Sequence, residues 1–291
     1  LFTPSNKLLL YFPNEKGFIV RQIWKLLAVY IFLFLVIIFS LSFIIHIINR
    51  QKKLSVMKND FINNMTHEFK TPISTIALAC EGLKDEDLKK IADVYNNYIG
   101  VIDEENGRLK SMAEQILQTA VIDKGQLKLK KTPLSINELI NNAVNSKMMA
   151  VEKKGGNIEL QLKATKSLIK ADRVHLTNVF INLLDNAIKY NLNRPHIIIN
   201  TVNRNNDLLI RVQDNGIGIS KSNQKRIFEK LYRVPTGNVH NFKGFGLGLS
   251  YVKAIVDLHK GDVQVDSDID KGSTFTISPV SYTNLRANDT T

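Results

Sequence analysis

The chain has 291 residues, 44% of them hydrophobic, which is enough for one conventional domain, a helical element and a membrane segment. The formal net charge is +12, but the lysines and arginines are spread along the chain instead of forming one dense basic tract, so we expect no nucleic acid partner. Cys80 is the only cysteine, which excludes an internal disulfide and is compatible with a reducing compartment.

The N-terminal region predicts a membrane anchor. Residues 1–25 are mixed in composition, contain turn signals and are interpreted as the remnant of a longer extracytoplasmic region. Residues 26–49 are almost wholly apolar, and at about 1.5 Å per residue they span a hydrocarbon core of about 30 Å. We predict a transmembrane helix in the lipid bilayer; a signal peptide is disfavoured because the run is too long and no small-residue cleavage site follows.

Residues 50–122 predict two amphipathic helices. Seven residues recur at steps of three and four and form one apolar stripe: Phe61, Met65, Phe69, Ile73, Ile76, Cys80 and Leu83. After a turn at LKDEDL, where Asp85 and Asp87 are candidate N-caps, a second periodic helix runs from Ile91 to Ile116. An antiparallel hairpin cannot bury both stripes alone, so we expect a homodimer that forms a four-helix bundle.

His67 lies off that stripe. At ~100° per residue it is roughly 160 to 200° around the helix from Met65 and Phe69, so it is displayed to solvent or to a partner. A neutral imidazole can attack phosphorus with one nitrogen while a carboxylate, here Glu68, holds the proton on the other. Thr71 is one turn further along the same face, and Pro72 is expected to loosen or bend the helix there.

Two other interpretations apply to the same residues. A zinc-protease helix H-E-x-x-H fails because Thr71 occupies the position of the second histidine. An isolated pair of His67 and Glu68 could also be an ordinary solvated surface pair, so the rest of the chain must decide.

Residues 123–278 predict an α+β sandwich, because strands and helices are mixed along this segment. Candidate helices cover residues 136–153 and 173–190; candidate strands cover 126–130, 158–162, 167–171, 196–202, 208–213, 263–265 and 273–277. Residues 279–291 are polar and patternless, and we assign them no structure.

The long helix at 173–190 places Asn178, Asn182, Asn186 and Lys189 on one face. Amide oxygens are hard neutral ligands suited to Mg²⁺, which also leans on substrate phosphates, and Lys189 can meet those phosphates as a point charge. The alternative is a set of asparagines stacked on a solvent face.

Two glycine-rich motifs follow. Asp214 ends a strand and can accept from the exocyclic amine of adenine, while Gly216 and Gly218 let the backbone pass close to a ligand. Three further glycines open a helix that runs to Leu258 and offers free N–H groups to phosphates: Gly244, Gly246 and Gly248. Residues 228–245 predict a lid, in which Arg233 either stabilises charge on a transferring phosphoryl group or is simply solvated.

HEFKTP at residues 67–72, the asparagine helix and the glycine motifs together resemble the H, N, glycine and F boxes of sensor histidine kinases of two-component systems, over roughly residues 52–277. The chain has no P-loop motif and no protein-kinase H-R-D or D-F-G set. The resemblance implies the Bergerat fold of histidine kinase and gyrase-like ATPases. It also implies that Asn182 and Asn186 coordinate Mg²⁺ and that Tyr190 and Thr274 belong to the ATP site.

The resemblance further implies that ATP phosphorylates His67 and that the phosphoryl group passes to an aspartate of a response-regulator receiver domain. In the family a polar residue at the position of Thr71 supports phosphatase activity toward the regulator. The implied location is the cell inner (cytoplasmic) membrane, with the catalytic region cytoplasmic. Two alternatives remain: an ATP-binding pseudokinase that only scaffolds a regulator, and a related ATPase that would have no use for His67.

Overall fold

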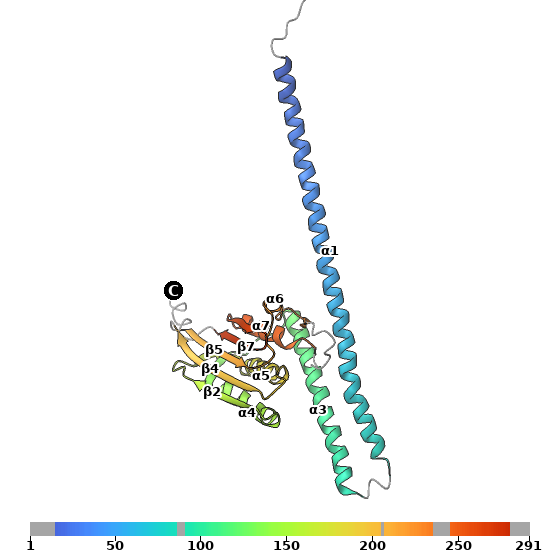
Figure 1. Cartoon of the computed structure of the whole chain (residues 1–291), viewed down its shortest axis with the longest axis vertical. Coiled ribbons are helices and arrows are strands. Elements are labelled where there is room, and N and C mark those ends of the chain that lie inside the picture. The colour runs from blue at the N-terminus through green and yellow to red at the C-terminus, as the bar shows by residue number, and fades with distance from the viewer. Residues whose placement is uncertain (1–14, 86–90, 205–206, 235–244, 280–291) are drawn as a thin grey trace, which may run out of the picture. The chain divides into compact units, whose positions relative to one another are not determined.

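A computed structural model of the chain describes residues 15–85, 91–204, 207–234 and 245–279 (Figure 1). The chain divides into two compact units, residues 1–56 and 57–291. The helices are α1 (Glu15–Gly82), α3 (Ala92–Asp123), α4 (Ile136–Lys153), α5 (Arg173–Lys189), α6 (Lys221–Gln224) and α7 (Gly248–Leu258). The strands are β1 (Thr132–Ser135), β2 (Asn157–Leu162), β3 (Leu168–Ala171), β4 (His196–Arg204), β5 (Asp207–Asp214), β6 (Asp262–Asp268) and β7 (Gly272–Ser278).

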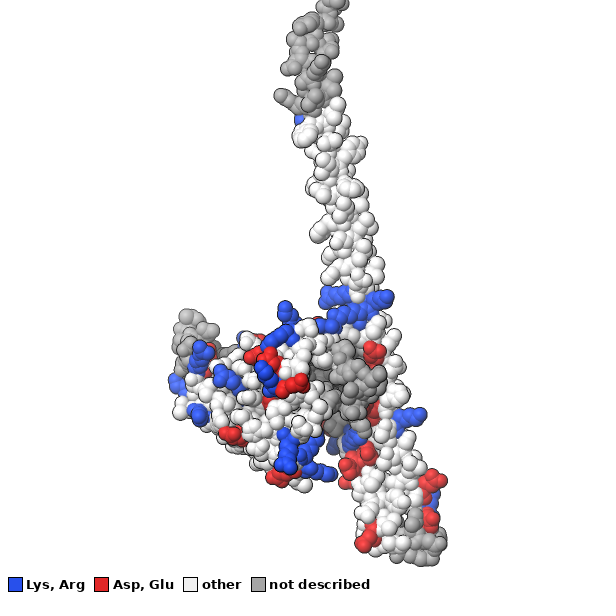
Figure 2. Space-filling view, viewed as in Figure 1, with Lys and Arg blue, Asp and Glu red and all other residues white. Residues whose placement is uncertain are grey.

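Helix α1 begins earlier than expected. Residues 15–25 are helical, so the prediction of turns in this segment is wrong for that part of it. From Ile23 onward the helix contains a stretch long and apolar enough to cross a membrane, by length and composition alone, and its side chains are exposed. In Figure 2 this stretch is white, and lysine and arginine side chains follow where it ends. The helix continues without interruption through Pro72 to Gly82, so the proline does not end it.

The hairpin of α1 and α3 buries a slightly different face from the predicted stripe. Phe61, Met65 and Phe69 are partly buried, but Ile73 and Cys80 are exposed. The buried positions beyond Phe69 are Pro72 and Ala79, because three successive four-residue steps from Phe61 to Ile73 turn by about 120° around a helix of 3.6 residues per turn.

The predicted caps of the second helix are wrong where they can be compared. The N-cap of α3 is Ile91, in an extended conformation and with no side-chain cap hydrogen bond, and Asp85 lies well before it. Asp87 lies outside the described residues. Near the turn, a Cβ at Gly82 would lie 2.7 Å from the ring of Tyr98, so the absence of a side chain there lets α3 approach α1 closely.

The segment after the hairpin contains a five-stranded mixed sheet with strand order β2-β4-β5-β7-β6. Strands β2 and β4 are parallel, and the other neighbours are antiparallel. Burial alternates along β4 and β5, as expected for a sheet with one face on the core. Helices α4 and α5 lie across one face of this sheet in Figure 1, and α7 packs beside α5. This is the α+β sandwich that the sequence predicted.

The core forms between these helices and the sheet. Helix α5 contributes Phe180, Leu183 and Leu184, which are at most 1% exposed, and the sheet contributes Ile199 and Ile210. Burial of each such side chain stabilises the fold by roughly 1.5 to 3 kcal/mol. Because this apolar face of α5 is fixed on the sheet, its asparagine-rich face is turned away from the sheet.

The candidate strand at 126–130 is wrong. The short strand is β1, from Thr132 to Ser135, and it pairs with β3 in a separate two-stranded sheet. The backbone N–H of Lys130 donates instead to the Asp172 carboxylate at 2.8 Å. Polar and apolar residues alternate from Gln126 to Lys130, as they do in a strand. The backbone N–H of Lys130, however, bonds a side chain and not a neighbouring strand.

A buried polar group joins α5 to α7. Asp172 caps α5 by accepting from the backbone N–H of His175 at 3.2 Å, and its own N–H donates to Nε2 of His259 at 3.0 Å. The His259 ring also bonds the Ile255 carbonyl through Nδ1, at 2.8 Å. These two bonds fit a neutral ring, and burial lowers the pKa of His259.

Candidate functional site

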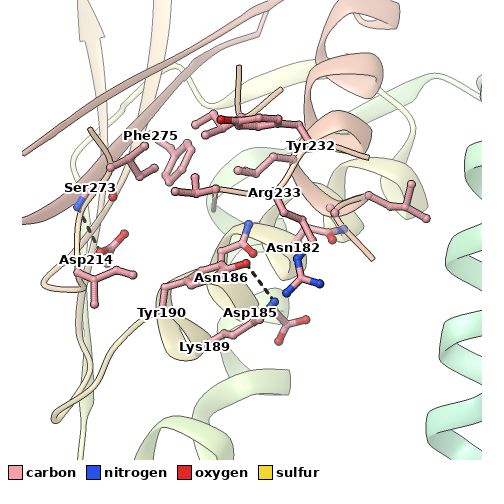
Figure 3. A pocket seen from close by; sticks show the side chains of 18 of the residues that line it. Asn182, Asp185, Asn186, Lys189, Tyr190, Asp214, Tyr232, Arg233, Ser273 and Phe275 are labelled. Atoms are coloured by element: carbon pink, nitrogen blue, oxygen red, sulfur yellow. Dashed lines mark hydrogen bonds between the residues drawn. The ribbon is translucent and has the colours of Figure 1, made fainter. Parts of the chain in front are cut away.

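The nucleotide site predicted from the sequence corresponds to a pocket of about 270 Å³ between α5, the glycine-rich segment before α7, and the ends of β5 and β7. The residues that line it are Gln115, Asn182, Asp185, Asn186, Lys189, Tyr190, Asp214, Ile217, Gly218, Ile219, Ile227, Tyr232, Arg233, Val234, Phe245, Gly246, Leu247, Gly248, Leu249, Ser273 and Phe275. Figure 3 shows Asp214 and Ser273 at one end and Asn182 and Arg233 toward the other.

The asparagine side chains of α5 present oxygen atoms to this pocket. Asn182 donates from Nδ2 to the Asn178 carbonyl at 2.8 Å, which leaves its Oδ1 turned toward α7, where a Cβ at Gly248 would lie 2.8 Å from it. The side-chain amide of Asn186 makes no hydrogen bond to a described residue. Both amide oxygens are therefore available to a ligand from one face of α5.

These donors fit a magnesium ion better than a metal bound by a cluster of acids or histidines. Within the described residues there is no group of three or more His, Cys, Asp or Glu side chains that could hold a metal. A site with one or two protein oxygens, completed by waters and substrate phosphates, is the arrangement that Mg²⁺ uses.

Lys189 and Tyr190 end α5 at the pocket. The ammonium group of Lys189 donates to the Tyr190 hydroxyl at 3.1 Å and lies 4.6 Å from the centroid of that ring. The charge of Lys189 is thereby directed along the pocket wall, and the Tyr190 ring gives that wall an apolar surface.

Asp214 is held by the backbone at the end of β5. Its Oδ1 accepts from the N–H of Gly216 at 2.8 Å and from the N–H of Ser273 at 3.2 Å, and Figure 3 marks the second of these bonds. Burial raises the pKa of the Asp214 carboxyl, against the opposite effect of these two bonds. With Oδ1 occupied, Oδ2 is the atom that can accept from a ligand amine.

The glycines occupy places that a side chain would block. Gly218 has φ +70°, and a Cβ there would lie 1.9 Å from the Asp268 carbonyl oxygen; a Cβ at Gly216 would lie 2.7 Å from the Tyr190 carbonyl oxygen. Gly246 also has φ +70°, and Gly246 and Gly248 line the pocket. Gly244 lies outside the described residues, as does most of the predicted lid.

One predicted site residue is replaced by its neighbour. Thr274 does not line the pocket, whereas Ser273 and Phe275 do. Side chains alternate between the two faces of a strand, so the residues on either side of Thr274 share the pocket face of β7 and Thr274 does not. Ser273 is the residue whose backbone supports Asp214.

The predicted phosphoacceptor lies elsewhere in the same unit. His67 is exposed on α1, and neither it nor Glu68 or Thr71 lines the pocket. The Glu68 carboxylate is paired with Arg108 of α3 at 3.3 Å, so it is directed toward the second helix of the hairpin. The Thr71 hydroxyl donates to the His67 carbonyl at 3.3 Å, a local bond that Thr75 makes in the same way to Thr71.

Comparisons with known proteins agree with this pair of sites. Residues 57–125 match the His Kinase A (phospho-acceptor) domain, and residues 171–282 match the histidine kinase-, DNA gyrase B- and HSP90-like ATPase family. Sensor protein RprX of Bacteroides fragilis is 45% identical over 270 residues, which cover 92% of this chain and 52% of that protein. The chain belongs to the sensor histidine kinases.

The histidine kinase spans about half the length of the relative RprX. Among solved structures it is similar to full-length ShkA in complex with AMPPNP, with a TM-score of 0.56 and 21% identity over 74% of this chain and 44% of that one. It is also similar to the histidine kinase ThkA in complex with the response regulator protein TrrA, with a TM-score of 0.53 and 23% identity over 79% of this chain and 63% of that one. These likenesses show the fold.

Several pocket residues of this histidine kinase were missed by sequence reasoning. Ser273 was detectable, because it is two residues from the apolar Phe275 on an alternating strand. Tyr232 could not have been found, since its hydroxyl bonds Asn223 at 2.7 Å in a loop with no periodic pattern. Gln115 belongs to the hairpin, and no local pattern relates α3 to the nucleotide pocket.

Proposed function

We propose that the chain is the kinase portion of a sensor histidine kinase that uses Mg·ATP to phosphorylate His67. The observation that carries the proposal is the presence, in one chain, of an exposed histidine on a helical hairpin and a pocket with Asp214 at one end and the Asn182 and Asn186 oxygens at the other. An ATPase without a phosphoacceptor has no use for the exposed histidine, and an ATP-binding pseudokinase that only scaffolds a regulator has no use for the pocket and the histidine together.

Different pocket residues bind different parts of the nucleotide. Asp214 Oδ2 accepts from the adenine amine, which selects adenine over guanine. Asn182 and Asn186 hold Mg²⁺, which when bound neutralises charge on the phosphates. Lys189 and the free N–H groups at the start of α7 meet the phosphate oxygens. Arg233 stabilises the charge that develops on the phosphoryl group in transfer.

In the transfer step one imidazole nitrogen of His67 forms a bond to the γ-phosphorus while the bond from that phosphorus to the β–γ bridging oxygen breaks, and ADP leaves. Glu68 holds the proton on the other imidazole nitrogen, which raises the electron density of the attacking nitrogen. Because Glu68 is paired with Arg108 in this structure, that ion pair loosens when the nucleotide domain delivers ATP to His67.

The phosphohistidine then transfers its phosphoryl group to an aspartate of a response-regulator receiver domain. The solved ThkA–TrrA complex is a histidine kinase with a response regulator protein, which supports this class of partner. For dephosphorylation of the regulator, Thr71 positions a water that attacks the phosphoaspartate of the docked receiver, which releases inorganic phosphate and restores the aspartate.

The proposed domains are a membrane helix at 26–49, a dimerisation and phosphotransfer hairpin at 50–122, and a catalytic domain at 123–278; the boundary between the first two lies within α1. The apolar helix supports an anchor in the inner membrane with the kinase in the cytoplasm. Exposed apolar side chains on the hairpin, among them Ile73, Leu78 and Leu117, support a homodimer in which a second copy covers them.

Mixing His67→Gln chains with Asn186→Ala chains restores labelling if transfer crosses between the protomers of that dimer. If transfer stays within one protomer, the mixture is not labelled even when the subunits exchange.

The deciding experiment is incubation of residues 52–277 with γ-labelled ATP and Mg²⁺, followed by acid and base treatment. A phosphohistidine is labile in acid and stable in base, so the label should be lost in acid and should be absent from His67→Gln. ATP hydrolysis without labelled protein would favour the related ATPase, and ATP binding with neither outcome would favour the pseudokinase.

A further inference from the structure

Helix α3 packs against the segment that leads into α7. Met112 forms a small buried cluster with Phe245 and Leu247, and five partly buried residues pack against it: Phe61, Met65, Phe69, Ile116 and Leu231. The Phe245 ring lies 6.2 Å from that of Phe61 and 6.1 Å from that of Phe69, centroid to centroid. The hairpin is therefore docked on the catalytic domain in this conformation.

An ion pair lies at the far end of the same face of α3. The Lys230 ammonium group contacts the Asp123 carboxylate at 2.5 Å, with both side chains about half exposed. Met112, Ile116 and Asp123 are separated by four and seven residues, which keeps them on one side of a helix. Apolar and charged contacts thus follow one continuous face of α3.

Gln115 lies on this docked face and lines the nucleotide pocket. It is three residues after Met112 and one before Ile116, and it is the one residue of α3 among the described residues that line the cavity. Its side chain is exposed, and its amide makes no hydrogen bond to a described residue. A polar group of the hairpin is therefore available inside a pocket that otherwise belongs to the catalytic domain.

The neighbours of Gln115 place it near the phosphate end. Its helix contacts Phe245 and Leu247, which lie three residues and one residue before Gly248 at the start of α7, whereas Asp214 lies on β5 at the adenine end. A side-chain amide there can donate to a phosphate oxygen or accept from a water bound to Mg²⁺.

We propose that Gln115 binds the phosphate end of the bound nucleotide, so that the hairpin completes the nucleotide site when it is docked. This inference rests on the proposed ATP site. Because the contact exists only in the docked conformation, nucleotide binding and docking must strengthen each other by the same factor. A nucleotide in the pocket then holds the kinase in the conformation in which Glu68 is paired with Arg108.

The test uses the whole chain in detergent, with Gln115→Leu as the variant and Gln118→Leu as its matched control, because Gln118 is on α3 and does not line the pocket. The ligand is the non-hydrolysable ATP analogue AMP-PNP with Mg²⁺, and its Kd is measured by calorimetry. Loss of one hydrogen bond to the charged phosphate end should raise the Kd of Gln115→Leu by about ten- to a hundredfold. Gln118→Leu should bind as the parent does.

Docking is measured in the same samples by carbodiimide cross-linking, which joins the Lys230 amine to the Asp123 carboxylate only when the two are in contact. We expect AMP-PNP to raise the yield of this cross-link in the parent and in Gln118→Leu, and to leave it at the nucleotide-free level in Gln115→Leu. A purely structural role for Gln115 would change the nucleotide-free yield instead.

The inference requires both the higher Kd of Gln115→Leu and the rise of the parent's cross-link yield with AMP-PNP. If the parent binds AMP-PNP and Gln115→Leu binds it equally well, or if nucleotide leaves the cross-link of the parent unchanged, the inference is wrong while the proposed function stands. If the parent chain does not bind AMP-PNP at all, the proposed ATP site fails, and this inference fails with it.

Discussion

Asp214→Asn tests the adenine assignment most directly, because the replacement has almost the same shape. In the parent, Oδ1 accepts two backbone N–H groups, from Gly216 and Ser273, at 2.8 and 3.2 Å. The oxygen of an asparagine can accept the same two bonds. Its NH₂ group then replaces Oδ2 and faces the adenine amine, so that a donor meets a donor.

The lost interaction is one charge-assisted hydrogen bond in a buried site. Such a bond contributes roughly 1.5 to 3 kcal/mol, which corresponds to about a ten- to hundredfold increase in the Kd for ATP. The folded protein itself should not lose stability. Because burial raises the pKa of Asp214, the folded state holds a proton more readily than the unfolded state, and ionised Asp214 opposes folding as pH rises through that raised pKa. A neutral asparagine removes this opposition.

The assay compares ATP affinity and thermal unfolding for the parent, Asp214→Asn and Asp266→Asn. Asp266 is an exposed carboxylate paired with Lys221 outside the pocket, and its replacement should change neither quantity. Acidification supplies a second reading. As pH falls through the raised pKa of Asp214, above the ordinary value of about 3.9, the parent should lose affinity relative to Asp214→Asn, and titration of the ATP phosphates cancels in that ratio.

Two results would refute this reasoning. Equal ATP affinity for Asp214→Asn and the parent would show that the carboxylate does not contact adenine. A loss of affinity that is matched by a lower unfolding temperature without nucleotide would show that Asp214 acts through the fold of the β5 end.

The remaining predictions concern the metal, the glycine turn and the phosphatase step. Asn186→Ala should retain most ATP binding without Mg²⁺ but lose Mg-dependent labelling of His67, so equal labelling would exclude Asn186 as a ligand. Gly218→Ala should lower the free energy of unfolding by more than the roughly 1 to 2 kcal/mol that a left-handed alanine costs, because its Cβ would also lie 1.9 Å from a carbonyl oxygen. The control Gly107→Ala, which has open space inside α3, should instead raise the free energy of unfolding by roughly 0.5 to 1 kcal/mol. Urea unfolding measures both changes. Thr71→Ala should keep most His67 labelling and slow dephosphorylation of the cognate regulator severalfold; loss of labelling with unchanged dephosphorylation would assign Thr71 to the kinase step.

Local patterns predicted the elements whose cause is local. The helix at 136–153 and the helix from Arg173 were predicted from their apolar periodicity, and both are present because a single face of each is buried. The strand at 126–130 was wrong because alternation alone does not provide a partner: β3 pairs with residues 132–135, and the Lys130 N–H is taken by a side chain. The start of α1 at Glu15 was missed because Gly17 was interpreted as a turn signal.

The residues of the candidate site also differ in whether a local pattern could predict them. Asn182, Asn186 and Lys189 were predicted to share a face and do line one pocket, since helical spacing alone brings them together. Thr274 was placed one residue off because a motif does not state which face of its strand is buried, and the pairing of β7 with β5 decides that Ser273 lies against Asp214.

Contacts between the hairpin and the catalytic domain have no local signal at all. Lys230 pairs with Asp123 across 107 residues of sequence. Periodicity showed that α3 has an apolar stripe, but Met112 and Ile116 would fit that stripe whether they faced α1, a second copy or the segment before α7. In the structure they pack with both α1 and the segment before α7, and Gln115, a polar residue beside the stripe, is thereby brought to the pocket. The side of α3 on which nucleotide occupancy can act is for this reason the docked side that carries Met112 and Ile116, whereas the exposed Leu117 is left for a second copy.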